Sequence, residues 1–297
     1  MNGREAGFLL LTSQLGDPER KPLTVAQFRT LASRARAASK PEQDRELKEK
    51  DLMALGYSQE MASRILKLLE GRELLEHYLS KAKRGGCVPL TRAGEQYPLR
   101  VRKRLGDDSP GCLWAKGDTS ILRTPCIALV GSRELRDENR SFAEQVGIQA
   151  AKHGYTLVSG NARGADKTAQ EACLQSGGRV ICVVADSLET HRQRHRVLYL
   201  SEDGFNDSFS SQRALSRNRI IHSLGEMTFV AQSSLHTGGT WDGTTRNLKS
   251  CWSHVFCFSD GSAAAQELEQ IGAQLISIEQ LNAWELLKDV DNFFDRV

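Results

Sequence analysis

Three short glycine-containing turns hold the residues of this sequence that could bind a charged ligand. Gly131-Ser132-Arg133 follows one short apolar run, Ser159-Gly160 follows a second, and Gly238-Gly239-Thr240 follows a third. Arg163 lies three residues after the second turn. Glycine lets the backbone approach a ligand closely, with free N–H groups aimed outward, and the planar guanidinium of arginine matches the geometry of a phosphate. The pattern therefore predicts a site for an anionic, phosphate-bearing ligand.

The elements that must position these turns are indicated by the apolar runs 126–130, 155–158 and 227–231, and the run 180–184 indicates a further strand of the same sheet. Short apolar runs without alternation are typical of strands covered on both faces, as in a parallel sheet flanked by helices. Helical patterns separate the runs, so the order predicts a doubly wound, extended Rossmann-like α/β sheet. The carboxyl ends of parallel strands meet at one edge, where we expect the three turns to converge.

A second basic cluster, Arg217-Asn218-Arg219, lies on one turn of a helix that the sequence predicts over 213–224. Arginine can bind phosphate, and asparagine can hydrogen-bond to phosphate or to a base edge. A solvated helix face is the alternative interpretation of this cluster. The residues that we predict to bind phosphate or DNA are Gly131, Ser132, Arg133, Ser159, Gly160, Arg163, Lys167, Arg217, Asn218, Arg219, Gly238, Gly239 and Thr240.

Several kinds of chemistry are disfavoured by the sequence. The first turn lacks the G-x-G-x-x-G spacing of a dinucleotide site, and a phosphate-binding loop with its lysine is absent too. The basic loop 191–196 is expected to be a surface loop, because no carboxylate or cysteine lies at a spacing that would complete a metal site. Serines and histidines show no spacing typical of a nucleophile with its base. We therefore predict no catalytic residues, no metal and no cofactor.

Composition indicates an ordinary globular protein. The 297 residues are 39% hydrophobic and 26% charged, with a net charge of +3, so binding to a polyanion must depend on local clusters of arginine. Seven scattered cysteines fit a reducing compartment. The first residues do not resemble a signal peptide and no apolar run is long enough to cross a bilayer, so we expect a cytoplasmic protein that does not bind a membrane.

The chain divides into four predicted segments. Residues 1–86 show short helical patterns, with a capping box at Thr24 and Gln27 and a further N-cap at Ser58, and we expect a small all-helical domain of the SAM or helix-hairpin-helix kind. Residues 87–119 contain several prolines and are predicted to be an extended connector. The Rossmann-like core is expected over 120–278, and a helical tail over 279–297.

With these residues in view, the chain resembles the DprA/Smf family of DNA-processing proteins. The resemblance extends over about residues 88–277. It rests on a set of short pieces in the order found in that family: Tyr97-Pro98, Leu113-Trp114, Gly117-Asp118, Val130-Gly131-Ser132-Arg133, Val158-Ser159-Gly160, Ala162-Arg163-Gly164, Asp166, Ser201-Glu202, Arg217-Asn218-Arg219-Ile220-Ile221, Gly238-Gly239-Thr240, Thr244 and Gly272-Ala273.

The resemblance implies a protein that binds single-stranded DNA without strong sequence preference, forms homodimers and helps to load a RecA-type recombinase onto incoming strands during natural transformation. Carried over by position, the DNA pocket of the family would comprise Gly131 to Arg133, Ser159, Gly160, Arg163, Arg217 and Asn218. The resemblance thus agrees with the phosphate site predicted from the residues.

Four features depart from the pattern of that family. Ala165 replaces an isoleucine, Gln170 replaces a histidine, and Ala231-Gln232 stands where the family has a carboxylate. The tail after Ser277 is shorter than the winged helix that many members carry. The pocket positions match better than these, so the resemblance supports DNA binding more directly than a recombination role, and a role in defence against foreign DNA stays open.

Two alternatives use the same fold. The LOG phosphoribohydrolases cleave nucleotides with a Pro-Gly-Gly-x-Gly-Thr turn and an arginine–glutamate pair, whereas this chain reads Thr237-Gly238-Gly239-Thr240 and has no glutamate between Thr244 and Cys251. Asp242 is the nearby carboxylate that could act as a general acid or base. The other alternative is a domain that senses a free nucleotide.

Overall fold

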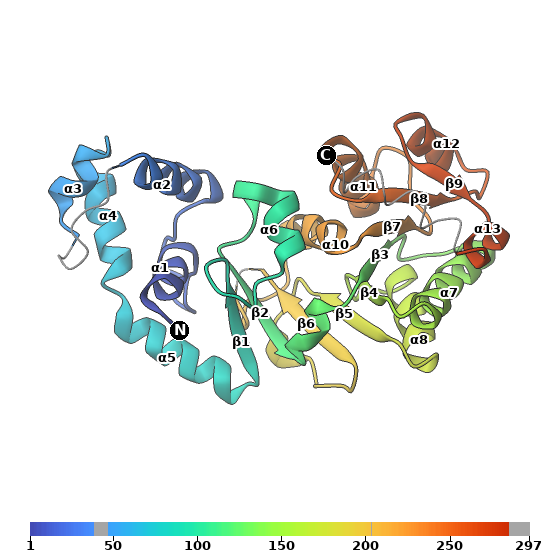
Figure 1. The fold of residues 1–297 in the computed structure, drawn as a ribbon, viewed down its shortest axis with the longest axis horizontal. Helices are drawn as coiled ribbons and strands as arrows, with labels where there is room; N and C mark the ends of the chain where they lie inside the picture. The colour runs from blue at the N-terminus through green and yellow to red at the C-terminus, as the bar shows by residue number, and fades with distance from the viewer. Residues whose placement is uncertain (39–46, 203, 285–297) are drawn as a thin grey trace.

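The computed structural model describes residues 1–38, 47–202 and 204–284, and a nine-stranded mixed sheet lies at its centre (Figure 1). The strands, in chain order, are β1 (Cys87–Thr91), β2 (Cys112–Gly117), β3 (Cys126–Val130), β4 (Thr156–Ser159), β5 (Arg179–Val183), β6 (Val197–Ser201), β7 (Met227–Val230), β8 (His254–Phe258) and β9 (Gln274–Ile276). Their spatial order is β1-β2-β6-β5-β4-β3-β7-β8-β9. Strands β3 to β9 pair in parallel, while β2 is antiparallel to both β1 and β6. The prediction of a doubly wound α/β sheet is confirmed.

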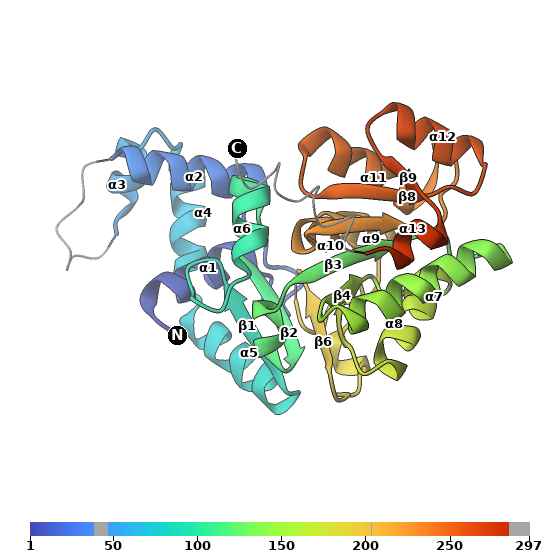
Figure 2. The same cartoon turned by 45° about the vertical axis from the view of Figure 1, so that its right-hand side comes forward.

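Helices cover both faces of the sheet, as Figure 2 shows. One face carries α7 (Asp137–Lys152), α8 (Ala165–Gln175) and α13 (Ile278–Asn282), and the other carries α6 (Leu99–Leu105), α9 (Ser211–Ser216), α10 (Asn218–Leu224), α11 (Gly238–Ser250) and α12 (Ala263–Gln270). Three short 3-10 helices, η1 (Gly106–Asp108), η2 (Thr119–Arg123) and η3 (Leu188–Thr190), lie in the connections. The strand side chains are buried on both faces, which explains the unbroken apolar runs of the sequence.

The N-terminal residues form the helices α1 (Gly3–Thr12), α2 (Val25–Ala37), α3 (Glu49–Ala54), α4 (Gln59–Leu69) and α5 (Arg72–Arg84), of which α1 was not predicted from the sequence. The capping box of Thr24 with Gln27 and the N-cap at Ser58 are confirmed. These helices share a small core that includes Phe28, Leu52 and Ile65. Helices α1 and α5 also pack into the core of the main sheet.

Residues 87–119, predicted to be an extended connector, contain β1, α6 and β2, and they extend the main sheet at one edge. Trp114 of β2 is fully buried and packs against Tyr78 of α5 and Phe205, with ring centroids 5.3 Å and 5.2 Å away. The pairing of β2 with β6 therefore explains why this segment is part of the sheet, which its prolines did not predict. The domain boundaries stay a prediction, and residues 285–297 of the predicted helical tail lie outside the described residues.

The order of the strands reverses next to β3. From β3 the chain proceeds through β4, β5 and β6 in one direction, and it then crosses back to place β7, β8 and β9 on the other side of β3. The connections that leave the carboxyl ends of β3 and β7 therefore diverge, which opens a crevice at that edge of the sheet.

No helix in the described part of the chain combines the length and the apolar character needed to cross a membrane.

Candidate functional site

A cavity of about 460 Å³ opens at the crevice between the carboxyl ends of β3 and β7, and we call it the carboxyl-edge pocket. Its walls come from the loop after β3, from the junction of α9 and α10, and from the first turn of α11. The predicted residues that line it are Gly131, Ser132, Arg133, Arg217, Asn218, Gly238, Gly239 and Thr240. Segments that are about a hundred residues apart in the sequence thus meet at one opening.

The turn after β3 is held closely against its neighbours. A Cβ atom at Gly131 would lie 2.5 Å from the Cβ of Ala165 and 3.2 Å from that of Ala231. The amide of Ser132 donates to the carbonyl of Gln232 (3.0 Å). The expectation that amides of this turn are free for a ligand is therefore wrong for Ser132. Because a side chain at residue 131 would collide with the Cβ of Ala165, this turn requires glycine.

Gln232 fixes the path of the loop that carries Arg133. Its side-chain oxygen accepts from the amide of Arg136 (3.0 Å), and its side-chain nitrogen donates to the carbonyl of Glu134 (3.2 Å). An amide can do both, whereas a carboxylate at this position could only accept. Gln232, next to the position where the family has a carboxylate, thus has a structural role that the sequence did not reveal.

The turn after β4 faces inward. Ser159 is fully buried and its hydroxyl accepts from the side chain of Gln170 (2.5 Å). The amides of Gly160 and Ala162 both donate to Oδ2 of Asp166 (3.0 Å each). The amide of Gly160, predicted to face a ligand, is therefore occupied by a carboxylate of the same chain, and neither Ser159 nor Gly160 lines the carboxyl-edge pocket.

Arg217 links this second turn to the pocket. Its guanidinium occupies the space where a side chain at residue 160 would lie, and its Nε atom is buried without a hydrogen-bond partner among the described residues. Burial lowers the pKa of Arg217, and the negative charge of Asp166 opposes that effect. Burial likewise raises the pKa of Asp166, against the effect of Arg217 and of the two amides. The pocket wall thus contains a buried cation whose nearest compensating charge is Asp166.

Arg133 supplies the second positive charge of the pocket. Its side chain is exposed at the end of the loop after β3 and forms no ion pair with the described residues. Its charge lowers the pKa of Asp166 and, after the larger effect of burial, that of Arg217, so the three groups lie close together. Two guanidinium groups of like charge beside one opening favour a bound anion.

The third turn differs from its prediction. Helix α11 begins at Gly238, so Gly238, Gly239 and Thr240, which were predicted to form a turn after a strand, instead form the first turn of a helix. The first-turn amides of a helix have no partners within it, and the N-cap residue Thr237 provides no side-chain hydrogen bond. Asn218 donates to the carbonyl of Gly239 (2.9 Å). The N-terminus of a 13-residue helix therefore opens into the same pocket.

The predicted helix over 213–224 is also interrupted. Helix α9 ends at Ser216 and α10 begins at Asn218, with Arg217 at the junction. Arg217 therefore lines the pocket, whereas Arg219, two residues later, pairs with Glu202 outside it.

Besides Ser159 and Gly160, three predicted residues do not line the pocket. Arg163 has a side chain that is 77% exposed and forms an ion pair with Glu134 (3.3 Å). Lys167 is exposed on α8. Arg219 lines a neighbouring cavity, where it forms an ion pair with Glu202 and donates to the hydroxyl of Ser216 (2.7 Å). The positions of Arg163 and Lys167 do not support a contact with a ligand in the carboxyl-edge pocket, and the guanidinium of Arg219 is held by groups of the same chain.

Among the described residues that line the pocket, Asp166 is the only carboxylate, and its Oδ2 atom is bound to two amides. Asp242, the candidate acid or base of a hydrolase, instead pairs with Arg246 (3.2 Å). His222 lies behind the pocket, and burial, followed by the charge of Arg217, lowers its pKa to about 3. The described residues contain no group of three or more histidine, cysteine or acidic side chains that could hold a metal ion. The arrangement is suited to binding phosphate.

Two apolar residues of the pocket were missed by the sequence analysis. Phe209 and Leu215 line it and are 56% and 45% exposed. Phe209 lies in the segment after β6 that the sequence left without an assignment, and Leu215 lies in the helix predicted over 213–224. Their type alone gives no signal, because an isolated aromatic residue in a loop is most often buried.

Residues 89–284 match the family described as DNA recombination-mediator protein A. DNA processing protein DprA of Streptococcus pneumoniae is 30% identical over 186 residues, which are 58% of this chain and 66% of that protein. Protein Smf of Escherichia coli is 32% identical over 142 residues, which are 44% of this chain and 38% of that protein. The chain therefore matches less than two thirds of the length of either relative.

Solved structures agree with the fold. The crystal structure of the S. pneumoniae protein superposes with a TM-score of 0.72 and 24% identity, over 95% of this chain and 98% of that chain. The structure of DNA processing protein A from Helicobacter pylori, which concerns the single-stranded DNA binding mode of that protein, gives a TM-score of 0.57 and 25% identity, over 68% of this chain and 96% of that chain.

Proposed function

This chain belongs to the DNA recombination-mediator protein A family, as its resemblance to DprA/Smf proteins implied, and we propose that it binds single-stranded DNA in the carboxyl-edge pocket. One observation carries this proposal: Arg133, Arg217 and the uncapped first turn of α11 all lie at one opening of about 460 Å³. Two arginines and a helix N-terminus attract the phosphates of the strand, and this attraction depends on salt.

The exposed apolar residues of the pocket favour a single strand over a duplex. Phe209 and Leu215 stand beside the phosphate-binding groups, where unpaired bases could contact them. Base stacking on an aromatic ring is open to a single strand, whereas a duplex keeps its bases stacked inside. The H. pylori relative, whose structure concerns its single-stranded DNA binding mode, supports the same choice of ligand.

We infer further that the protein acts by binding and not by catalysis, because the one carboxylate of the pocket is held by two amides. By analogy with its family, it would work in the cytoplasm as a homodimer and help a RecA-type recombinase to bind incoming strands. These finer roles are part of the proposal and rest on family membership.

The proposal is tested by fluorescence anisotropy with labelled oligo-dT over a series of salt concentrations. Substitution of both Arg133 and Arg217 by alanine should weaken binding by at least about tenfold and reduce the salt slope by about two, one for each phosphate that the variant no longer neutralises. The matched control replaces Arg140 and Lys152, two exposed cations of α7 on the other face of the sheet, and should bind as the wild type does. Equal affinity of both double variants would exclude the carboxyl-edge pocket.

A further inference from the structure

The carboxyl-edge pocket continues into two further cavities on the same face of the sheet. A cavity of about 520 Å³ shares Leu215 and Asn218 with it. That second cavity shares Arg104 and Trp252 with a third, of about 1180 Å³, which lies at the opposite edge of the sheet. The three cavities thus adjoin one another in series through these shared lining residues, and we call them together the α11 groove.

Helix α11 forms one wall of this groove along its whole length. Gly239 lines the first cavity, and Gly243, Arg246 and Ser250 line the second. These positions are three or four residues apart, so they lie on one face of the helix. Trp252, just beyond the helix, lines both the second and the third cavity. The 13 residues of α11 span about 20 Å, so the groove is longer than a single nucleotide.

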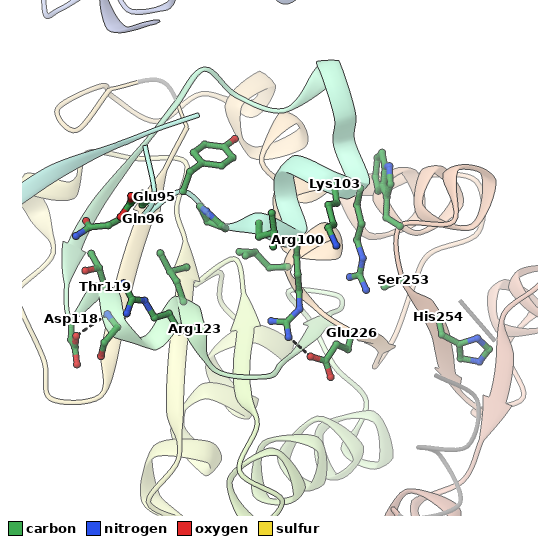
Figure 3. A pocket seen from close by; sticks show the side chains of 18 of the residues that line it. Glu95, Gln96, Arg100, Lys103, Asp118, Thr119, Arg123, Glu226, Ser253 and His254 are labelled. Carbon is green, nitrogen blue, oxygen red and sulfur yellow. Dashed lines mark hydrogen bonds and ion pairs between the residues drawn. The ribbon is translucent and has the colours of Figure 1, made fainter. Parts of the chain in front are cut away.

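The third cavity lies at the amino ends of β3, β7 and β8, between α6 and η2 (Figure 3). Two of its cations have structural partners: Arg100 pairs with Glu226, and Arg104 donates to the carbonyls of Ser223 (3.2 Å) and Gly225. They hold the carboxyl end of α10, where positive charge is favourable.

Two other cations of the third cavity are available to a ligand. Lys103 of α6 and Arg123 of η2 are exposed, come from opposite walls, and form no ion pair with the described residues (Figure 3). The cavity also contains three carboxylates. Glu226 is paired with Arg100, and Asp118 accepts from the amide of Ser120 (2.9 Å), which leaves Glu95 as the acid without such a partner among the described residues. This balance suits one or two phosphates and not a large polyanion.

We propose that single-stranded DNA bound in the carboxyl-edge pocket runs along α11 to the third cavity, where Lys103 and Arg123 bind its phosphates. The inference rests on the proposed function, since the strand must first occupy the carboxyl-edge pocket. It assigns a second phosphate-binding site at the amino edge of the sheet and predicts that affinity increases with strand length until the groove is filled.

The test compares oligo-dT of about six nucleotides with oligo-dT of about twenty by anisotropy at fixed salt. Replacing both Lys103 and Arg123 by alanine should weaken binding of the longer strand by about tenfold and lower its salt slope by about two, while binding of the short strand changes less than about twofold. The variant with Arg140 and Lys152 replaced removes the same two charges elsewhere and should leave both strands unaffected. Circular dichroism verifies that each variant is folded.

The outcomes distinguish the two proposals. One outcome is that the Lys103 and Arg123 variant matches the control with both strand lengths while the Arg133 and Arg217 variant still loses binding. That result would refute the path of the strand along the α11 groove and would leave the proposal of DNA binding in the carboxyl-edge pocket intact. A wild-type protein that binds neither strand refutes the pocket, and the groove with it. An equal loss with short and long strands would also overturn the groove, because it would place these cations inside the short site.

Discussion

The guanidinium of Arg217 lies against the α-carbon of Gly160, in the space that any side chain at residue 160 would occupy. Gly160 is therefore required by the volume of a neighbouring side chain and not by an unusual backbone angle, since its φ is not among the positive values of this chain. The sequence suggested a different reason, the close approach of a ligand to the backbone. The glycine shapes the pocket indirectly, by making room for the arginine.

Substitution of Gly160 by alanine should therefore displace Arg217 and weaken oligo-dT binding by about tenfold, the effect expected when one phosphate is no longer bound by an arginine. The end of a long side chain can move, so the free energy of unfolding should fall by only about 1 kcal/mol. Anisotropy and urea denaturation measure the two effects. The control is Gly7→Ala in α1, where nothing lies within 4 Å of the added methyl group. Unchanged binding by Gly160→Ala would show that Arg217 does not contact the strand.

Acid should strengthen DNA binding through Asp166. Protonation of Asp166 removes the negative charge beside Arg217, which can then interact more strongly with phosphate. Because burial raises the pKa of Asp166, this change begins at a higher pH than it would for an exposed aspartate, and affinity increases as the pH falls. Asp166→Asn should bind oligo-dT more tightly than the wild type at neutral pH.

The two proteins are compared by anisotropy between neutral pH and about pH 4, where the phosphates stay ionised. All other titratable groups are common to the two proteins, so the difference between them isolates Asp166. The affinities should converge as the pH falls. A difference that persists down to the lowest pH, or a variant that binds more weakly at neutral pH, would contradict this role of Asp166.

The sequence predicted the sheet, and it predicted that the first and third turns meet at one edge, because parallel strands have a fixed relation to their connections. The apolar run 126–130 became β3 without any change of bounds, whereas the second turn faces inward and does not line the pocket. The prediction for residues 87–119 lacked the pairing of β2 with β6, a contact between strands more than eighty residues apart. Local patterns contain no such information.

The hydrogen-bond partners of individual backbone amides could not be predicted from the sequence either. The amides of Ser132 and Gly160 belong to glycine turns of the expected kind, yet they donate to the carbonyl of Gln232 and to Asp166. Their partners come from the loop after β7 and from the start of α8, which only the folded chain brings near. The break between α9 and α10 could not be predicted either, because the helical pattern over 213–224 is continuous. That pattern gives no sign that Arg217 and Arg219 have different surroundings.

Arg219 should matter for stability and not for binding. It forms a half-buried ion pair with Glu202 and donates to Ser216, so Arg219→Ala leaves a carboxylate without its partner and should lower the free energy of unfolding by about 3 kcal/mol. Arg163→Ala, which breaks the exposed pair with Glu134, is the control and should cost less than about 1 kcal/mol. Urea denaturation gives both values. A loss of oligo-dT affinity in folded Arg219→Ala, with unfolding unchanged, would instead support the predicted contact with DNA.

Phe209 should provide a surface on which a base of the bound strand stacks. Phe209→Ala should weaken oligo-dT binding by about tenfold, since stacking of one base on an aromatic side chain contributes about 1–3 kcal/mol. Its salt slope should equal that of the wild type, because every cation that binds phosphate is retained, and Phe209→Tyr should restore the affinity. Ile271→Ala removes another exposed apolar side chain away from the pocket and should bind normally. Equal weakening by the alanine and tyrosine variants would exclude stacking as the role of this ring.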